Sequence, residues 1–342
     1  MANLLTTRLL RHIPRIYLIE VIALLHLLIL QWLMAKANLT LPMENLWITG
    51  KLYLMTFLPP MVGAVVLGTV YSAFRGRGKA YLKRIFSMEW IVMTVRVLIL
   101  STLVSHTYCW LKLLIPLLNS ASFDARLWNI DTVMGFGLSP NVFFLHLFSY
   151  PPVLKGLDAL YINVFSITLL IGNAIFTALP STRVRMAYAT GSGYLWLVGG
   201  WLYLLMPSLG PCYAYPHVWE SFTTFLPRSV VLQKALLDNY NRILGIPGGT
   251  IDAGIVLVHG IAAFPSLHVA SQTFIAFWVR RYSLTLGFVL MVSVGLLWLG
   301  SIVTGWHYMV DSIVGLFLGW ACFAVVWKTF KIPRWKRLIS IL

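Results

Sequence analysis

Two histidines and one aspartate near the C-terminal end of the chain have the residue types and the spacing of a catalytic group. His268 ends the segment 264–268, Phe-Pro-Ser-Leu-His, and His307 precedes Asp311 by four residues. His307 follows His268 by 39 residues, which is enough for two membrane crossings of about 20 residues each. We therefore predict that all three side chains meet at one face of a membrane.

The chemistry that this group predicts is nucleophilic attack assisted by proton transfer. Residues four apart share a helix face, so Asp311 is expected to hold one ring N–H of His307 and leave the other nitrogen free to attack. His268 would then give or take a proton. Ser266 is expected at a helix N-terminus, where free N–H groups favour an anion such as phosphate, and Pro265 suits the first turn of that helix.

The composition is that of a membrane protein. Hydrophobic residues make up 59% of the 342 residues, charged residues make up 11%, and the mean hydropathy is +0.82. Soluble domains carry about 25% charged residues. We predict an all-α, polytopic membrane protein without internal repeats. The cysteines show neither a C-x-x-C pair nor metal-ligand spacing and are interpreted as packing residues: Cys109, Cys212 and Cys322.

Eight apolar runs predict about eight transmembrane helices. Three of them form an N-terminal part, residues 1–108, and five belong to a catalytic core, residues 109–342. Two long segments, 109–159 and 207–263, are predicted as extracytoplasmic loops that cap the site, because long loops are usually functional. The predicted spans lie near residues 16–35, 52–74, 89–108, 160–179, 187–206, 264–279, 284–304 and 308–327.

The net charge of +16 is interpreted as a signal of membrane topology and not of nucleic-acid binding. Most of the 26 Lys and Arg residues lie in five strips without an acid, around 8–15, 75–84, 183–185, 280–281 and 328–337. The positive-inside rule then predicts cytoplasmic termini and an active site on the extracytoplasmic or lumenal face. Arg96 lies inside a predicted span and is expected to pair with an internal acid such as Glu20 or Glu89.

The motifs Pro-Ser-x-His at 265–268 and His-x-x-x-Asp at 307–311 resemble the second and third motifs of the type 2 phosphatidic acid phosphatase superfamily. The fuller form, with Phe264 and Tyr308, is most similar to the inositol phosphorylceramide synthase branch. The resemblance implies a six-helix catalytic core, a phosphohistidine on His307 and an acid–base role for His268. It also implies a lipid donor and a lipid or polyol acceptor, between which a phosphorylated head group is transferred.

The sequence departs from the phosphatases at their cationic positions. They carry an arginine six residues before the nucleophilic histidine, where this chain has Ser301, and their first motif, a lysine followed seven residues later by Arg-Pro, has no counterpart. A dianionic phosphomonoester would be poorly held without these cations, so transfer from a diester is favoured. Ser266 and Ser301 are expected near the phosphate, and the candidate cations are Arg228, Arg242, Lys155 and Arg126.

Other functions are kept as alternatives. Water in place of the acceptor would make the same site a lipid phosphate or pyrophosphate phosphatase. A zinc site built from the two histidines and Asp311 would need a further ligand with local spacing, so we predict neither a metal nor another cofactor. A transporter would be expected to show paired repeats or charges at mid-membrane. A non-catalytic membrane protein of the same superfamily is the last alternative.

Overall fold

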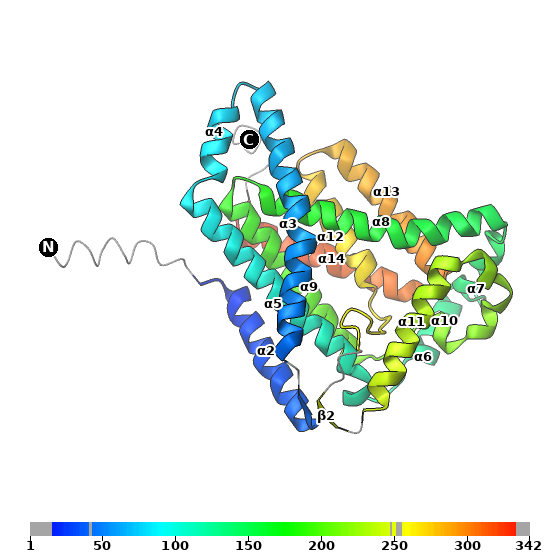
Figure 1. Ribbon diagram of the computed structural model, residues 1–342. Helices are drawn as coiled ribbons and strands as arrows, with labels where there is room; N and C mark the ends of the chain where they lie inside the picture. Colours follow the sequence, from blue (N-terminus) through cyan, green and yellow to red (C-terminus); the bar gives the residue numbers. More distant parts are fainter. Residues whose placement is uncertain (1–15, 41–42, 247, 251–254, 333–342) are drawn as a thin grey trace.

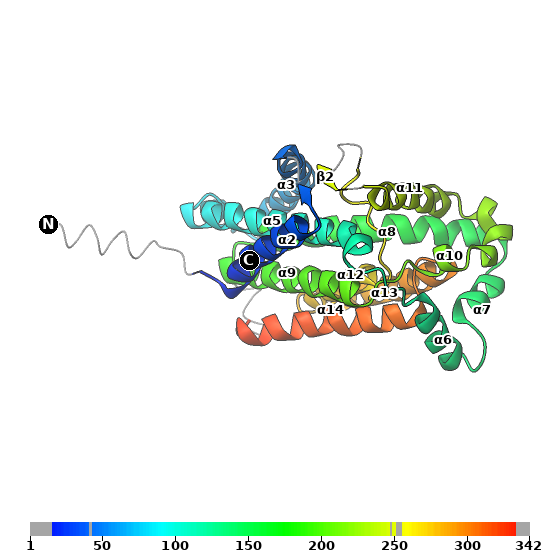
Figure 2. The same cartoon turned by 90° about the horizontal axis from the view of Figure 1, so that it is seen from below.

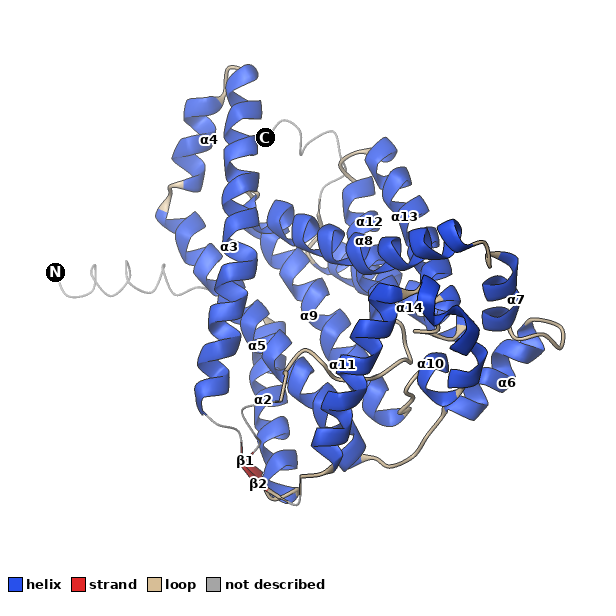
Figure 3. Ribbon diagram, turned by 45° about the vertical axis from the view of Figure 1, so that its right-hand side comes forward, coloured by secondary structure: helices blue, strands red, loops and turns tan. Residues whose placement is uncertain are grey.

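The computed structural model describes residues 16–40, 43–246, 248–250 and 255–332, and this part of the chain is almost wholly helical (Figure 1). Within it, the only sheet is a two-residue parallel pairing of β1 (Leu39–Thr40) with β2 (Gly249–Thr250) (Figure 3). The predicted all-α class is confirmed. The helices are α2 (Leu18–Lys36), α3 (Met43–Phe74), α4 (Gly78–Ile85), α5 (Met88–Leu118), α6 (Asp124–Met134), α7 (Pro140–Leu147), α8 (Pro151–Ala178), α9 (Thr182–Leu205), α10 (Pro211–Ala214), η1 (Pro216–Val218), η2 (Glu220–Phe225), α11 (Pro227–Leu244), α12 (Leu267–Arg280), α13 (Leu284–Val303) and α14 (Met309–Thr329).

Six of the predicted spans coincide with helices that are long and apolar enough to cross a membrane. Many of their large apolar side chains are exposed, as expected of surfaces that face lipid. The chain is therefore an integral membrane protein. The six helices are α2, the segment Trp47–Phe74 of α3, α5, α8, α13 and α14.

The two remaining predicted spans correspond to α9 and α12, which lie inside the bundle. α12 has 14 residues, about 21 Å at 1.5 Å per residue, and so falls short of a hydrocarbon core of about 30 Å. α9 is long enough, but it carries buried polar residues such as Arg185 and Thr190. Length and composition thus identify six of the predicted spans. Helices surrounded by other helices need not be apolar on every side, so the count of eight stays a prediction.

The core of the bundle lies where α8, α9, α12 and α14 meet around large aromatic side chains. The rings are each no more than 3% exposed and pack against one another in stacked, tilted and edge-to-face pairs: Phe176, Tyr188, Phe274, Trp278 and Phe323. Burying such rings supplies most of the packing energy available to a helical bundle. This core fixes α12 and α14, the two helices that carry the predicted catalytic residues.

Two glycines allow α14 to approach α12 at backbone distance. A Cβ placed on Gly315 would lie 2.4 Å from the carbonyl oxygen of Ser266, and one placed on Gly319 would lie 2.2 Å from that of Ala270. Small residues four apart are a common means of close packing between membrane helices. Here they bring the N-terminal ends of α12 and α14 together, and with them the two predicted catalytic segments.

The predicted loops contain helices of their own. α5 continues to Leu118, ten residues beyond the predicted end of its span, and α8 begins at Pro151. The short helices α6, α7 and α10, together with α11, gather at one end of the bundle (Figure 2). Residues 109–118 and 151–159 of the predicted loops thus belong to α5 and α8, and the described parts of 119–150 and 207–263 form an ordered cap.

Three smaller expectations concern charges and thiols. Arg96 of α5 forms an ion pair with Glu20 of α2 through two hydrogen bonds, which confirms the predicted internal pairing. Cys109, Cys212 and Cys322 are all free. The terminal basic strips, within 8–15 and from 334 onwards, lie outside the described residues.

We predict that Gly319→Ala lowers the thermal unfolding midpoint and the activity together, because the added methyl group must push α14 away from α12. Overpacking of this kind costs about 1–3 kcal/mol. Gly295→Ala on α13 is the matched control, since a Cβ there meets no atom within 4 Å. Differential scanning fluorimetry in detergent measures the effect. Equal midpoints for the two variants would contradict the close packing.

Candidate active site

The first catalytic segment is the start of α12. Ser266 is the N-cap residue, and its hydroxyl oxygen accepts a hydrogen bond from the backbone N–H of Val269 at 3.4 Å. Pro265 therefore precedes the cap and does not lie in the first turn as the sequence suggested. The backbone N–H of Ser266 donates to the carbonyl oxygen of Asp311 at 3.0 Å. His268 lies in the first turn of α12, at the end of this helix that is next to the start of α14.

The second segment is the tight connection between α13 and α14, which carries His307. The carbonyl oxygen of Ser301 accepts the N–H groups of Trp306 at 2.9 Å and His307 at 3.3 Å. From α7, the side-chain amide of Asn141 donates to the carbonyl oxygens of Ile302 at 2.9 Å and His307 at 3.1 Å. Asn141 is fully buried. The α13–α14 connection is thus held by hydrogen bonds from α13 and from α7.

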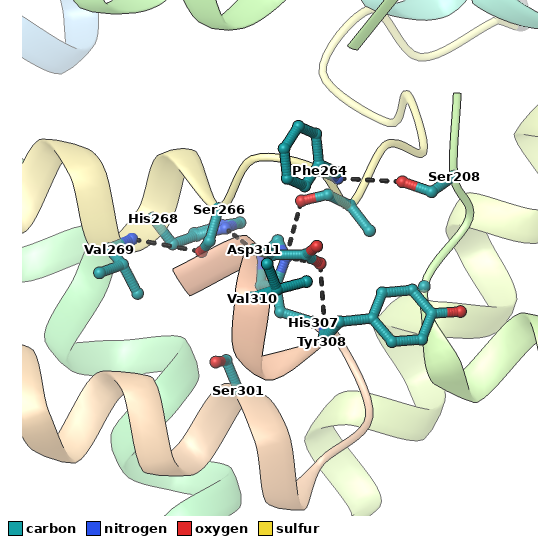
Figure 4. A network of polar contacts seen from close by, with 12 residues as sticks. Ser208, Phe264, Ser266, His268, Val269, Ser301, His307, Tyr308, Val310 and Asp311 are labelled. Carbon is teal, nitrogen blue, oxygen red and sulfur yellow. Dashed lines mark hydrogen bonds and ion pairs between the residues drawn. The ribbon is translucent and has the colours of Figure 1, made fainter. Parts of the chain in front are cut away.

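The imidazole of His307 is oriented by acceptors on one side and faces His268 on the other (Figure 4). Its Nδ1 lies 2.9 Å from the carbonyl oxygen of Ala263 and 3.4 Å from Oδ2 of Asp311. A carbonyl oxygen only accepts, so Nδ1 carries the proton and Nε2 of the neutral ring has a free lone pair. Nε2 lies 3.4 Å from Nδ1 of His268. The structure thus brings His268, His307 and Asp311 together.

The environment of His307 keeps its ring neutral at physiological pH. The side chain lies between two spans and is 3% exposed. Burial and, to a smaller extent, the positive charge of Lys112 lower the pKa of His307 to about 3, although the hydrogen bond to Ala263 opposes the shift. A neutral imidazole with one free nitrogen is the nucleophilic form.

Asp311 serves both the helix and the histidine. Its Oδ2 accepts the backbone N–H of Tyr308 at 2.9 Å, an N-terminal capping interaction of α14 (Figure 4), and the same oxygen lies near Nδ1 of His307. Oδ1 is buried and has no hydrogen-bond partner among the described residues. The carboxylate is therefore placed to stabilise positive charge that develops on the ring.

Two aspartates of α6 bind the segments around the site. Asp131 accepts the backbone N–H groups of Met309 at 2.5 Å and Val310 at 2.9 Å, at the start of α14. Burial raises the pKa of Asp131 to about 6, although both N–H donors lower it. Asp124 accepts the N–H of Gly210 at 2.9 Å and the hydroxyl of Tyr308 at 2.8 Å. α6 therefore ties the 207–211 segment to the catalytic end of α14.

Of the residues predicted to bind phosphate, the two serines lie near the histidines and the two arginines do not. Ser266 and Ser301 are fully buried, and the hydroxyl of Ser301 donates to the carbonyl oxygen of Trp298 at 2.7 Å. Both serines adjoin the histidines through the backbone. Arg228 and Arg242 are exposed on α11, and neither lines the two cavities that contain His268. The alternative cations Arg126 and Lys155 are exposed as well.

The cation that does reach the site was missed in the sequence. Lys112 lies in α5 and lines both cavities that contain His268. The predicted span ended at residue 108, which left Lys112 in a supposed loop, whereas the helix continues to Leu118. The signal was a single lysine in the apolar run 109–118, Cys-Trp-Leu-Lys-Leu-Leu-Ile-Pro-Leu-Leu. Ala263 and Asn141 were also missed, because they act through tertiary hydrogen bonds.

The candidate catalytic residues lie within a segment that matches a known family. A family model described as the PAP2 superfamily matches residues 125–325. The chain belongs to the PAP2 superfamily. The match covers both histidines, Asp311 and the α6 aspartate Asp131, and it starts after Lys112. PAP2 membership supports a lipid phosphatase or phosphotransferase type of function. No curated protein and no solved structure matches the chain.

We predict that Asp131→Ala lowers both the thermal unfolding midpoint and the activity, because two backbone N–H groups at the start of α14 lose their acceptor. Leaving buried donors unsatisfied costs about 1–3 kcal/mol. Asp131→Asn keeps one acceptor oxygen and is expected to lose less. Asn129→Ala, at an exposed position of the same helix, is the control. The same midpoint in Asp131→Ala and in the control would show that α6 does not hold α14.

Proposed function

We propose that this PAP2 superfamily member is a lipid phosphotransferase that moves a phosphorylated head group between lipids through a phosphohistidine on His307. The activity resembles that of inositol phosphorylceramide synthases. The observation that carries the proposal is the placement of His307: Nδ1 bonds to the carbonyl oxygen of Ala263 at 2.9 Å, and Nε2 faces His268 at 3.4 Å. A positioned nucleophile next to a proton carrier is the arrangement that covalent phosphoryl transfer requires.

The reaction runs in two steps that share these residues. Nε2 of His307 attacks the phosphorus of the donor and the bond to the leaving oxygen breaks. That oxygen takes its proton from the imidazolium form of His268, which the negative charge of the bound phosphate stabilises. Asp311 stabilises the positive charge on the phosphorylated ring. The hydroxyl of the acceptor then attacks the phosphorus, its proton goes to His268, and the phosphorus–nitrogen bond breaks. Both histidines return to their starting states.

The charge near the nucleophile favours a diester donor over a monoester. The position of the phosphatase arginine is taken by Ser301, which is buried and hydrogen-bonded within α13. Cations around the equatorial oxygens are worth about 10³-fold or more in phosphoryl transfer. A monoester dianion loses more from their absence than a diester with one charge. A lipid phosphate phosphatase, with water as acceptor, is the second candidate, favoured by the family match alone.

The basic residues support a site on the extracytoplasmic or lumenal side. α12 begins with His268 in its first turn and ends at Arg280, and α14 begins near Asp311 and ends with Lys328 in its last turn. The ends of α12 and α14 that carry basic residues are therefore opposite the ends that carry the proposed catalytic residues. By the positive-inside rule the basic ends lie in the cytoplasm, and the lipids react on the other face.

Removing the catalytic groups is expected to have unequal effects on transfer. His307→Ala should abolish turnover, and His268→Ala should lose about 10²–10⁴-fold, since proton transfer contributes on that scale. Asp311→Asn should lose less than the roughly 10⁴-fold found for a triad carboxylate, because Ala263 still fixes the tautomer. His146→Ala, exposed at the same end of the bundle, is the control.

The measurement for these variants is head-group transfer from a radiolabelled donor, with acid-labile label on the protein as a second readout. Trapped label is expected in the wild type and should be absent in His307→Ala. Well-folded His307→Ala that keeps a tenth of wild-type turnover would show that another residue is the nucleophile.

Transfer is expected to be faster than hydrolysis when purified protein is given both kinds of substrate. The assay uses a panel of glycerophospholipid diester donors with ceramide or diacylglycerol acceptors, and phosphatidic acid as the monoester. Mass spectrometry of the lipids and release of inorganic phosphate are followed together. Hydrolysis of phosphatidic acid that exceeds transfer from every diester donor would reverse the assignment in favour of the phosphatase.

A further inference from the structure

A single lysine is placed inside the helical bundle beside the catalytic histidines. Lys112 lies six residues before the end of α5, in an apolar stretch, and is only partly exposed. Among the described residues the ion pair is that of Arg96 with Glu20, since the His307 ring beside Asp311 is neutral, so no carboxylate in that part of the chain pairs with Lys112. Its Nζ lies 5.5 Å from the ring centroid of Tyr203, the cation–π contact that the structure gives it.

An ammonium group in this position is costly for the folded protein. Charges inside a membrane protein lose their hydration, and when they are retained they mark substrate or ion sites. A cation–π contact returns about 0.5–2 kcal/mol, which does not replace hydration or a carboxylate. Lys112 is therefore better explained by an anion that binds there than by a contribution to the fold.

Two cavities of about 280 Å³ each meet at this lysine. The residues that line both are Lys112, Phe165, Val258 and His268. One cavity, which we call the cap cavity, also reaches His307 and residues 258–262 of the cap. An anion at the junction would thus lie next to both histidines.

The other cavity, which we call the chain cavity, runs between α5, α8 and α9. Along α5 its lining extends from Lys112 back to Val97, which is 15 residues or about 22 Å of helix. That length exceeds half of a hydrocarbon core of about 30 Å. Most of its lining is apolar, including Leu100, Val104 and Leu169. A long, apolar cavity with a cation and a nucleophile at one end has the shape of a lipid with a phosphate head.

We propose that Lys112 binds the phosphate of the lipid substrate at the junction of the two cavities, with a hydrocarbon chain of that lipid in the chain cavity. The proposal rests on the proposed function and names the group that replaces the phosphatase cations. Lys112 lies 13 residues before the segment that matches the PAP2 superfamily, residues 125–325. The cation is supplied by a helix outside that match, and one lysine balances the single charge of a phosphodiester.

Binding of orthovanadate, a phosphate analogue, tests the lysine separately from turnover. Wild-type protein, Lys112→Met and Lys112→Arg in nanodiscs are titrated with vanadate by isothermal calorimetry. Lys112→Met should weaken binding about 10- to 100-fold, the scale of a lost charge-assisted hydrogen bond. Lys112→Arg should restore part of it. Lys155→Met, exposed on α8, should bind as the wild type does.

Thermal stability without vanadate distinguishes a binding role from a structural one. A buried lysine whose role is to bind substrate destabilises the ligand-free protein. The unfolding midpoint of Lys112→Met should therefore equal or exceed that of the wild type. A lower midpoint together with weaker binding would make Lys112 structural. Unchanged vanadate binding in Lys112→Met would also overturn the proposal.

The chain cavity is tested by filling it. Ser105 of α5 lines this cavity and not the cap cavity, so Ser105→Phe should raise the KM for a long-chain donor about tenfold or more. Vanadate binding should stay at the wild-type level, which also shows that the variant is folded. An unchanged KM would place the chain elsewhere.

The same variants separate this inference from the transfer reaction. Wild-type transfer that persists in Lys112→Met overturns the role of the lysine and leaves the transferase assignment intact. Conversely, vanadate binding could depend on Lys112 while the protein only hydrolyses monoesters. That result would overturn the transferase assignment and support the anion site.

Discussion

The active site depends on one hydrogen bond, between Nδ1–H of His307 and the carbonyl oxygen of Ala263. It selects the tautomer, and it turns the free nitrogen towards His268. Ala263 is itself held by Ser208, whose carbonyl oxygen accepts the Ala263 N–H at 2.9 Å and whose hydroxyl accepts the Phe264 N–H at 3.0 Å. The catalytic geometry is thus set by backbone groups of a segment that lies far from His307 in the sequence.

Helix packing places that bond within reach. Gly315 and Gly319 let α14 lie against α12 at backbone distance, and Asp131 holds the first N–H groups of α14 from α6. Neither the glycine contacts nor the hydrogen bonds of Asp131 belong to the proposed substrate-binding groups. Together they keep the segments that carry His268 and His307 close to each other, so that the short helix α6 and the long helices contribute to the same candidate site.

The parts of this arrangement that were predictable are those that follow from spacing along one helix or between spans. His268 and His307 were expected to meet because two crossings separate them, and Asp311 was expected beside His307 because it lies one turn later. Ala263 was not predictable, because any residue type offers a carbonyl oxygen. Lys112 was not identified because the predicted span ended at residue 108, ten residues before the helix does. Length and composition do not identify α9 and α12 as spans, because α12 is short and α9 carries buried polar residues inside the bundle.

The carbonyl of Ala263 also decides which nitrogen of His307 can carry a phosphoryl group. Nδ1, the pros nitrogen, is occupied by its proton and lies against the backbone of the 263–266 segment, so no electrophile approaches it. Nε2, the tele nitrogen, faces His268, and both histidines line the cap cavity. A phosphoryl group carried by this ring, as proposed above, would therefore be bonded to the tele nitrogen.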